Sequence, residues 1–315
     1  MGPWPFTCFE MPNDKKLNSY LHLHLIVFIW GFTAVLGALI TLEALPLVWY
    51  RMVFAVGFIY LYMFFKKIPL RLPPRTIMVF LVAGLVIAMH WLTFFKAIKE
   101  SNISITLACL STGAFFTSIL EPVFYKKKMV WYELFFGLIV LAGLYFVINS
   151  TEQDFFQKSI SSNLSGTMKG VLLALSSAFL SASFSIINGK FANKYDPTVI
   201  SFYEIVGGVL FLSVFMAFTQ SFTASFFHLS FNDLKWLLIL SSVCTAYAFI
   251  ASVGVMKYLS PYTVMLTINM EPIYGILLAL VVFSDKEKMS AQFYIGALII
   301  LSTVILNGVL KNRKK

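Results

Sequence analysis

A single carboxyl group stands in a stretch of the chain that is otherwise almost wholly apolar. Glu271 lies about ten residues into the stretch 262–284 and is followed by Pro272. Proline has no amide hydrogen, so the carbonyl of Ile268 loses its helical partner beside this carboxyl. A low-dielectric setting favours the neutral carboxyl, which suits a group that takes up and releases a proton. The alternative is a structural carboxyl satisfied by an ion pair or an interhelical hydrogen bond.

Hydroxyl groups share a helical face with this carboxyl. Thr263, Thr267, Glu271 and Tyr274 recur at i, i+4, i+8 and i+11, a spacing that places them in one stripe. With Asn269, this stripe predicts a helix whose polar face borders a cavity.

Other ionisable residues also lie inside apolar stretches. A charge there costs about 2.5 to 3.5 kcal/mol on insertion scales, so such side chains usually face the interior of a helix bundle. Arg51 and Glu204 each lie seven residues into a stretch. They are interpreted either as partners in an ion pair or as functional groups, Arg51 for an anionic part of a substrate and Glu204 for coupling. Glu121, close to the basic run 126–128, is interpreted as an interfacial salt-bridge residue.

Aromatic and small polar residues add further candidates. His90 titrates near neutrality, although a lone membrane histidine is more often a hydrogen-bonded core residue. Trp30 is central in its stretch, away from the interfacial belt, so it either packs or forms a stacking wall. Serine-rich faces, such as Ser177, Ser181 and Ser185, either pack closely or line a cavity. The expected substrate or coupling site is Glu271, Asn269, Thr267, Tyr274, Glu204, Arg51, His90, Trp30, Ser111 and Tyr247, with no catalytic residue, cofactor or metal.

Long apolar stretches must position these groups. Hydrophobic residues make up 59% of the 315 positions and charged residues 12%, too apolar for a soluble fold of this size. A helix needs about 20 apolar residues to cross the hydrocarbon layer. Ten stretches qualify: 20–40, 44–65, 76–97, 103–125, 130–149, 168–190, 198–219, 234–256, 262–284 and 291–310. We expect an all-α integral membrane protein with ten transmembrane helices.

The longest polar connection divides these helices five and five. Segment 45–57, LPLVWYRMVFAVG, resembles 196–208, DPTVISFYEIVGG, and 134–149 resembles 293–308. Because each half has an odd number of helices, the halves insert in opposite orientations, as inverted five-helix repeats around a midplane site. The expected parts are an N-terminal cytoplasmic segment 1–19, a first repeat 20–149, an extracytoplasmic linker 150–167, a second repeat 168–310 and a basic cytoplasmic tail 311–315.

The basic residues predict the orientation. Sixteen of the 24 Lys and Arg fall on the side that holds the two termini, against seven on the other side. Since basic residues in short loops favour the cytoplasm, both termini are expected there. The net charge of +10 follows this pattern rather than one amphipathic face, so no nucleic-acid partner is expected.

Several segments resemble the drug/metabolite transporter superfamily, in particular bacterial proteins with two EamA-type repeats. They are FIWGFTAVLG at 28–37, the segment 45–57, LSPYTVMLTINMEPIYGILLALVVFSDKE at 259–287 and the following FYIGALIILSTVIL. The resemblance implies a ten-helix permease or exporter of the bacterial inner membrane with a central cavity, for metabolites such as amino acids, purines or nucleotide-like compounds. The segment 115–128, FFTSILEPVFYKKK, departs from the family pattern, so no roles are carried onto the fourth helix.

The expected function is transport of a small, neutral or zwitterionic metabolite by alternating access, proton-coupled or exchange-driven. No GxxxxGK[ST], HExxH or GxSxG pattern occurs in the sequence. The alternative is a membrane-embedded enzyme acting on a lipid or small molecule. The expected partners are the small-molecule substrate and the lipid bilayer. The fifth and tenth helices have no ionisable residue in their cores, so they should lie peripherally, where a homodimer contact could form.

Overall fold

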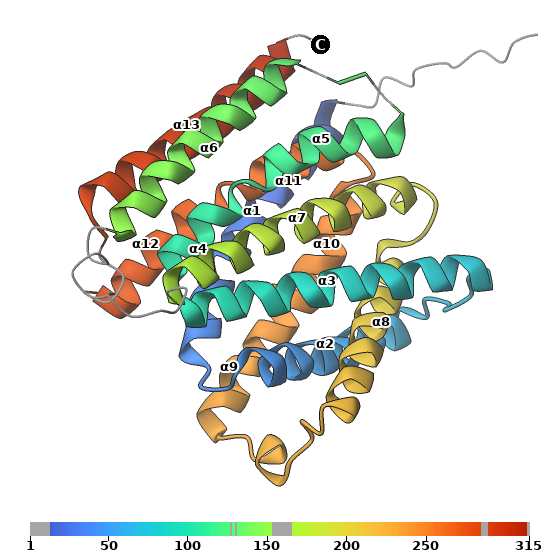
Figure 1. Cartoon of the computed structure of the whole chain (residues 1–315). Coiled ribbons are helices and arrows are strands. Elements are labelled where there is room, and N and C mark those ends of the chain that lie inside the picture. Colours follow the sequence, from blue (N-terminus) through green and yellow to red (C-terminus); the bar gives the residue numbers. More distant parts are fainter. Residues whose placement is uncertain (1–12, 127, 130, 153–165, 285–288, 314–315) are drawn as a thin grey trace, which may run out of the picture.

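The computed structural model describes residues 13–126, 128–129, 131–152, 166–284 and 289–313, and every regular element among them is a helix (Figure 1). The first half contains α1 (Asn13–Leu39), α2 (Ala44–Lys66), α3 (Pro74–Glu100), α4 (Ile103–Leu110), α5 (Gly113–Tyr125) and α6 (Trp131–Glu152). The second half contains α7 (Gly166–Phe191), α8 (Pro197–Phe218), η1 (Ala224–Phe227), α9 (Phe231–Ser241), η2 (Ser242–Tyr247), α10 (Ala248–Val255), α11 (Pro261–Ile268), α12 (Glu271–Phe283) and α13 (Ala291–Arg313). The all-helical expectation is confirmed for these residues.

Eight helical spans among the described residues are long and apolar enough to cross a membrane. Their outward faces carry large apolar side chains such as Phe64, Phe65 and Phe218, which are 67%, 72% and 85% exposed. Only a bilayer makes such a surface favourable, so this is a multi-pass integral membrane protein. The spans are Leu17–Leu39, Ala44–Lys66, Pro74–Glu100, Ile103–Tyr125, Met168–Phe191, Pro197–Phe218, Phe231–Val255 and Pro261–Phe283.

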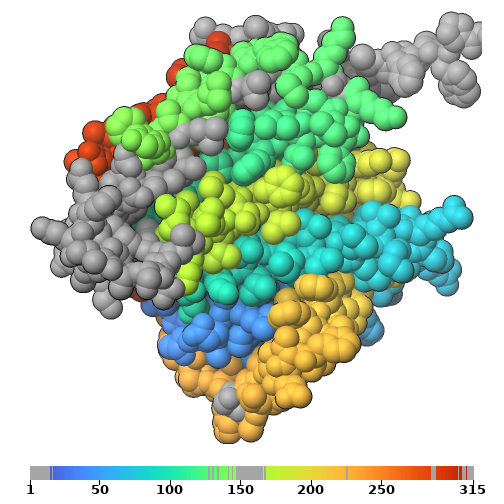
Figure 2. All heavy atoms as spheres, viewed as in Figure 1, coloured from blue at the N-terminus to red at the C-terminus, as the bar shows by residue number. Residues whose placement is uncertain are grey.

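The two halves interleave rather than forming separate bundles. Helix α7 of the second half packs against α3 and against both α4 and α5 of the first half (Figures 1 and 2). Helices α6 and α13 pack against each other at one edge, as expected for peripheral elements (Figure 1). Any movement between the halves must therefore slide these contacts past one another.

The second helices of the two halves run antiparallel. The Trp49 Nε1–H of α2 donates to the Ser213 Oγ of α8 over 2.8 Å. Farther along α2, the ring of Tyr60 lies 6.3 Å from that of Phe202. Residue numbers rise along α2 as those of its partners on α8 fall, so the two helices point in opposite directions.

Two spans are interrupted in the same way. Helices α4 and α11 have 8 residues each, α5 and α12 have 13 each, and two residues separate the members of each pair. In the second half Pro272 accounts for the interruption, because it cannot donate to the carbonyl of Ile268. In the first half the Thr112 hydroxyl donates to the Cys109 carbonyl over 2.8 Å, a bond that bends helices. The interruption in 103–125 was not predicted.

The interrupted spans cross at their centres. A Cβ on Gly113 would meet the side chain of Met265, and one on Gly275 would meet Leu107. Thus α5 lies against α11 and α4 against α12, which makes this pair of spans antiparallel as well. The two residues between the members of each pair are Ser111 and Thr112 in one span and Asn269 and Met270 in the other.

A π-helix, η2, interrupts the span between α9 and α10. Thr245 Oγ1 donates to the Leu240 carbonyl five residues earlier over 2.7 Å, and the Trp30 Nε1–H of α1 donates to the Cys244 carbonyl over 3.1 Å. Such π-turns occur frequently at functional sites. The sequence predicted an uninterrupted helix over 234–256.

A polar clasp joins the halves at the end of the bundle opposite to Asn13. The Thr41 backbone N–H and hydroxyl donate to the two carboxylate oxygens of Asp233, each over 2.7 Å. The Ser230 hydroxyl donates to the same carboxylate over 2.8 Å. Asp233 is 2% exposed, so little water competes for these bonds.

Replacing Asp233 by Asn should weaken this clasp. The amide lacks the charge that strengthens bonds from three donors, so the free energy of unfolding should fall by about 2 kcal/mol. Thermal unfolding of the purified protein in detergent measures this loss. Asp196→Asn is the matched control, because Asp196 caps α8 within one half and Asn caps as well as Asp does. Equal unfolding temperatures for the two variants would contradict the clasp.

Candidate functional site

A central cavity of ≈ 70 Å³ lies where corresponding elements of the two halves meet. Its lining comes from α1 and α7, from α3 and α10, and from α4 and α11, with α12 adding one residue. The space accommodates several water molecules or one small polar group. Helices at the same place in each half therefore face the same space.

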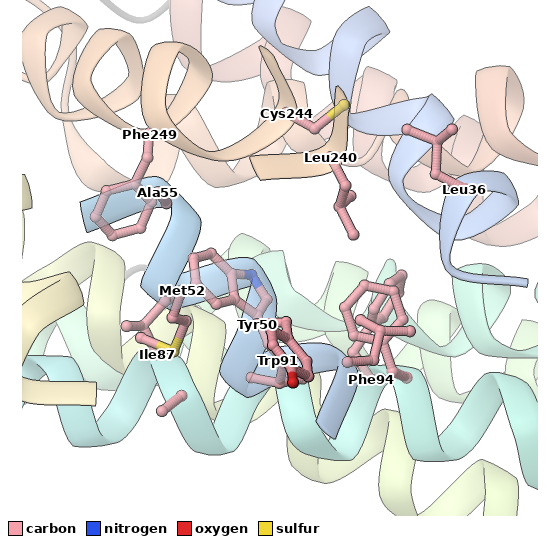
Figure 3. Packing of buried hydrophobic residues seen from close by; sticks show 14 of the residues in the cluster. Leu36, Tyr50, Met52, Ala55, Ile87, Trp91, Phe94, Leu240, Cys244 and Phe249 are labelled. Atoms are coloured by element: carbon pink, nitrogen blue, oxygen red, sulfur yellow. The ribbon is translucent and has the colours of Figure 1, made fainter. Parts of the chain in front are cut away.

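Trp and Phe side chains from α1, α3, α7 and α10 form one part of the cavity wall. Figure 3 shows Trp91 and Phe94 rising from α3 toward the span that carries Cys244 and Phe249. The ring centres of Trp91 and Phe249 are 5.7 Å apart, and Phe249 stacks on Phe184 of α7 at 5.3 Å. Such walls offer flat apolar faces to a ring or an aliphatic chain and attract cations through their π electrons.

Glu271 is the acidic group of this wall. It lies at the start of α12, lines the cavity and is 6% exposed. Within the described part of the chain, no hydrogen bond reaches its carboxyl and no basic group lies in ion-pair contact with it. The structural alternative, a carboxyl satisfied by a partner, therefore has no support here. A buried carboxyl without a partner is either protonated, and so neutral, or it is a carboxylate that binds a cationic ligand.

Arg51 lies behind the aromatic wall. Its Nε–H donates to Thr245 Oγ1 over 2.7 Å, and its guanidinium carbon lies 4.0 Å from the ring centre of Trp91. The side chain is 1% exposed. It is close enough to interact electrostatically with Glu271, so it offsets part of the acidic charge without touching it.

The ion pair between Arg51 and Glu204, one of the two interpretations of these residues, does not form. Both carboxyl oxygens of Glu204 are buried without a hydrogen-bond partner. The reason lies in the helical register: Met52 faces Gly208 of α8, and consecutive residues of a helix point about 100° apart. Arg51 therefore points toward η2, away from the carboxyl.

His90 has a defined tautomer. Its Nδ1 lies 2.9 Å from the carbonyl oxygen of Ser177, and since a carbonyl only accepts, Nδ1 carries the hydrogen. The Ser177 hydroxyl in turn donates to the His90 carbonyl over 3.0 Å. His90 lines the cavity, and in the neutral ring Nε2 is left as an acceptor. His90 is therefore hydrogen-bonded in the core and also borders the cavity.

The remaining candidates divide into three groups. Trp30 lines the cavity. Ser111, Thr267 and Asn269 are buried in the interrupted spans without lining it, and Asn269 Nδ2 has no partner among the described residues. Tyr274 is half-buried and packs edge-on against Phe28 at 5.4 Å.

Tyr247, expected in the cavity, lies instead on the bundle surface. It is 45% exposed, and its hydroxyl is 3.0 Å from His22 Nε2. Thr245 faces Arg51, and in this π-helix two further residues turn the chain by about half a turn, to the opposite face. If Thr245 is taken to face the bundle interior, this rotation predicts from the sequence that Tyr247 faces outward.

Several lining residues were not singled out in the sequence. Thr33, Phe184 and Phe249 line the cavity, and only the spacing of Ser181, Phe184 and Ser185 at i, i+3 and i+4 pointed toward them. The described residues hold no group of three or more His, Cys, Asp or Glu side chains placed to bind a metal.

Comparisons with known proteins agree with this architecture. A family model described as the EamA-like transporter family matches the chain twice, over residues 18–149 and 168–309. A protein of Archaeoglobus fulgidus described as an uncharacterized transporter is 23% identical over 299 residues, which cover 93% of this chain and 97% of that protein. A solved crystal structure superposes with a TM-score of 0.68 at 14% identity, covering 95% of this chain and 99% of the other. At that identity the likeness shows the fold alone.

Proposed function

This chain belongs to the EamA-like transporter family, and on that premise we propose that it moves a small metabolite across the bacterial inner membrane by alternating access through the central cavity. The observation that carries the proposal is the pair of interrupted spans, which cross beside a cavity lined from both halves. Interrupted helices at corresponding positions of two repeats are the best indicator of a transporter's binding site.

The proposed architecture is two inverted repeats of five transmembrane helices, with α6 and α13 as the fifth and tenth. The double match of the family model supports two repeats. The antiparallel contacts of α2 with α8, and of α4–α5 with α11–α12, support opposite insertion, because equivalent helices of parallel repeats would point the same way. With an even number of spans, both termini lie on one side, and the basic residues assign that side to the cytoplasm.

We propose further that the structure corresponds to a state closed toward the outside. The cavity reaches Met256 and Val264, close to the loop that joins α10 and α11. That loop lies on the same side as Ser19, since Ser19 and Tyr258 border one surface groove. The clasp around Asp233 lies at the other end of the bundle. Releasing the clasp while closing the inner side would expose the same cavity to the outside.

Glu271 is the proposed coupling group. A proton taken up from one side neutralises the carboxyl while it is enclosed, and release to the other side follows when the cavity opens there. The acceptor nitrogen of His90 and the Thr33, Ser181 and Ser252 hydroxyls supply hydrogen bonds for a neutral or zwitterionic substrate. Exchange of one substrate for another would use the same cavity without net proton movement.

Metabolite profiling tests transport against the enzyme alternative. The internal and the external pool of at least one small metabolite should both differ between cells that overproduce the protein and cells that lack it. The two pools should change in opposite directions, one rising as the other falls. Unchanged pools together with a new covalent product would favour a membrane-embedded enzyme and overturn the proposal.

Filling the cavity should block transport. Ser181→Trp places an indole in a space of ≈ 70 Å³, so the transport rate in vesicles should fall by about tenfold or more. Ser176→Trp is the matched control, because Ser176 lies on the exposed face of the same helix. If the two variants transported equally well, the cavity would not be the path of the substrate.

A further inference from the structure

A surface groove lies on the outside of the bundle, separate from the central cavity. It has a volume of ≈ 250 Å³ and runs between α1, the first turn of α8 and α10. Among the described residues, none lines both the groove and the cavity. The groove is therefore not part of the proposed substrate path.

The groove has a polar end at the level where its spans leave the membrane. Ser19, Thr198 and Tyr258 line this end, and each lies within three residues of the end of a span. Ile250, also in the lining, lies five residues before Val255, where its span stops. At 1.5 Å per residue, this places Ile250 about 7.5 Å deeper in the membrane. One end of the groove thus lies at headgroup level and the other among the acyl chains.

The deeper part of the groove is apolar and faces lipid. Ile250, Ala251 and Gly254 of α10 form it, and all three are half-buried. On α1, which supplies another wall, Leu21 and Leu25 are 61% and 48% exposed. Hydrocarbon is the solvent at this depth, so an acyl chain is the occupant that fits. In the groove it gains dispersion contacts that a flat helix face does not offer.

Basic residues are concentrated at the polar end. The segments 13–19, 190–198 and 256–260, which carry the lining residues of this end, hold five Lys against two Asp. An excess of positive charge between transmembrane helices at headgroup level attracts anionic lipid headgroups. The charge of the groove therefore matches a lipid phosphate as its depth matches an acyl chain.

Two of these lysines lie close to the lining along the chain. Lys257 directly precedes Tyr258. The Ser19 hydroxyl donates to the Lys15 carbonyl over 2.9 Å, so Lys15 lies one turn beyond Ser19, on the side away from the acyl chains. Of the two aspartates, Asp196 already accepts a backbone amide as the cap of α8. The positive charge at this end is thus only partly compensated.

We propose that this groove binds one anionic phospholipid, with its phosphate at the polar end and one acyl chain along α10. The hydroxyls of Thr198 and Tyr258 are able to donate to phosphate oxygens, and Lys15 and Lys257 supply charge. A zwitterionic phospholipid would fill the same hollow but would bring a cationic group near the lysines. The inference does not depend on transport.

Native mass spectrometry of the purified full-length chain in detergent tests the site, with added dioleoylphosphatidylglycerol or dioleoylphosphatidylcholine. One phosphatidylglycerol should be retained per chain, with an affinity at least about fivefold above that for phosphatidylcholine. Lys257→Gln should lower the affinity for phosphatidylglycerol about fivefold and leave that for phosphatidylcholine unchanged. Inorganic phosphate should not displace the lipid, because it lacks the acyl chain.

Gly254→Leu should fill the groove and abolish the retention of phosphatidylglycerol. A Cβ at position 254 meets its nearest heavy atom, in Pro197, at 3.8 Å, an ordinary contact that leaves the fold intact. Gly57→Leu is the matched control, since Gly57 is exposed on α2 and a Cβ there meets nothing within 4 Å. That variant should retain the lipid as the unmodified chain does.

Four results would overturn the site: equal affinity for the two lipids, displacement of the lipid by inorganic phosphate, lipid retention in Gly254→Leu as strong as in Gly57→Leu, or a lipid-free dimer, which would assign the groove to a second copy of the chain. None of them involves metabolite movement. A chain that retained no phospholipid but transported normally would remove this site and leave the proposed function in place.

Discussion

Glu271→Gln is expected to lower transport driven by a pH gradient by about 100-fold or more, with little effect on folding. The amide matches the carboxyl in size but cannot release a proton. Since no hydrogen bond among the described residues reaches the Glu271 carboxyl, and it lines the cavity, the substitution breaks no contact there. Proteoliposomes with an imposed pH gradient and a metabolite identified by profiling provide the measurement.

Glu121→Gln is the control for this substitution, because Glu121 precedes Pro122 just as Glu271 precedes Pro272. Glu121 does not line the cavity, so its variant should keep the transport rate within about twofold. Exchange of labelled for unlabelled substrate should persist in Glu271→Gln, since that cycle needs no net proton step. Undiminished transport along the pH gradient in Glu271→Gln would rule out this residue as the coupling group.

Gly84→Ala should be among the most destabilising single substitutions in the membrane domain. A Cβ at this position would meet the backbone carbonyl of Glu204 and lie 2.8 Å from the amide nitrogen of Gly208. The backbone of α8 cannot move aside as a flexible side chain can, so α3 and α8 must separate. We expect a loss of about 3 kcal/mol in the free energy of unfolding, measured by thermal or denaturant unfolding in detergent.

Gly57→Ala is the matched substitution on α2. No heavy atom lies within 4 Å of a Cβ built there, and alanine favours a helix over glycine by up to about 1 kcal/mol. Its stability should therefore be unchanged or slightly increased. If the two alanine variants unfolded at the same temperature, close packing of α3 against α8 would not be the reason for glycine at position 84.

Hydropathy predicted the spans well because the bilayer imposes one requirement, an apolar length, on every crossing helix. All eight described spans fall on predicted stretches. Hydropathy carries little information on which way a residue faces within a bundle. Glu271, His90 and Trp30 line the cavity, since polar or misplaced aromatic groups in lipid-spanning segments need an interior environment. Their part in substrate binding or coupling stays a prediction.

The errors came from the rotation of helices within the bundle and from departures from the ideal helix. Arg51 and Glu204 lie equally deep in their predicted stretches, but the rotation of α2 turns Arg51 toward Thr245. The bend at Ser111 arises from hydroxyl bonds to the backbone, which residue type alone does not distinguish from simple packing. The cause of the interruption before Pro272 is visible in the sequence, because proline lacks the amide hydrogen that a helix needs.

The π-helix η2 contains one residue more per turn than the helices that flank it. If the facing direction of side chains is calculated at 3.6 residues per turn, the directions predicted before Ser242 and after Tyr247 therefore do not match. A relative that lacks the extra residue should align with this chain only through a gap within the membrane. An ungapped alignment there would match inward positions such as Ser252 with residues that face the acyl chains.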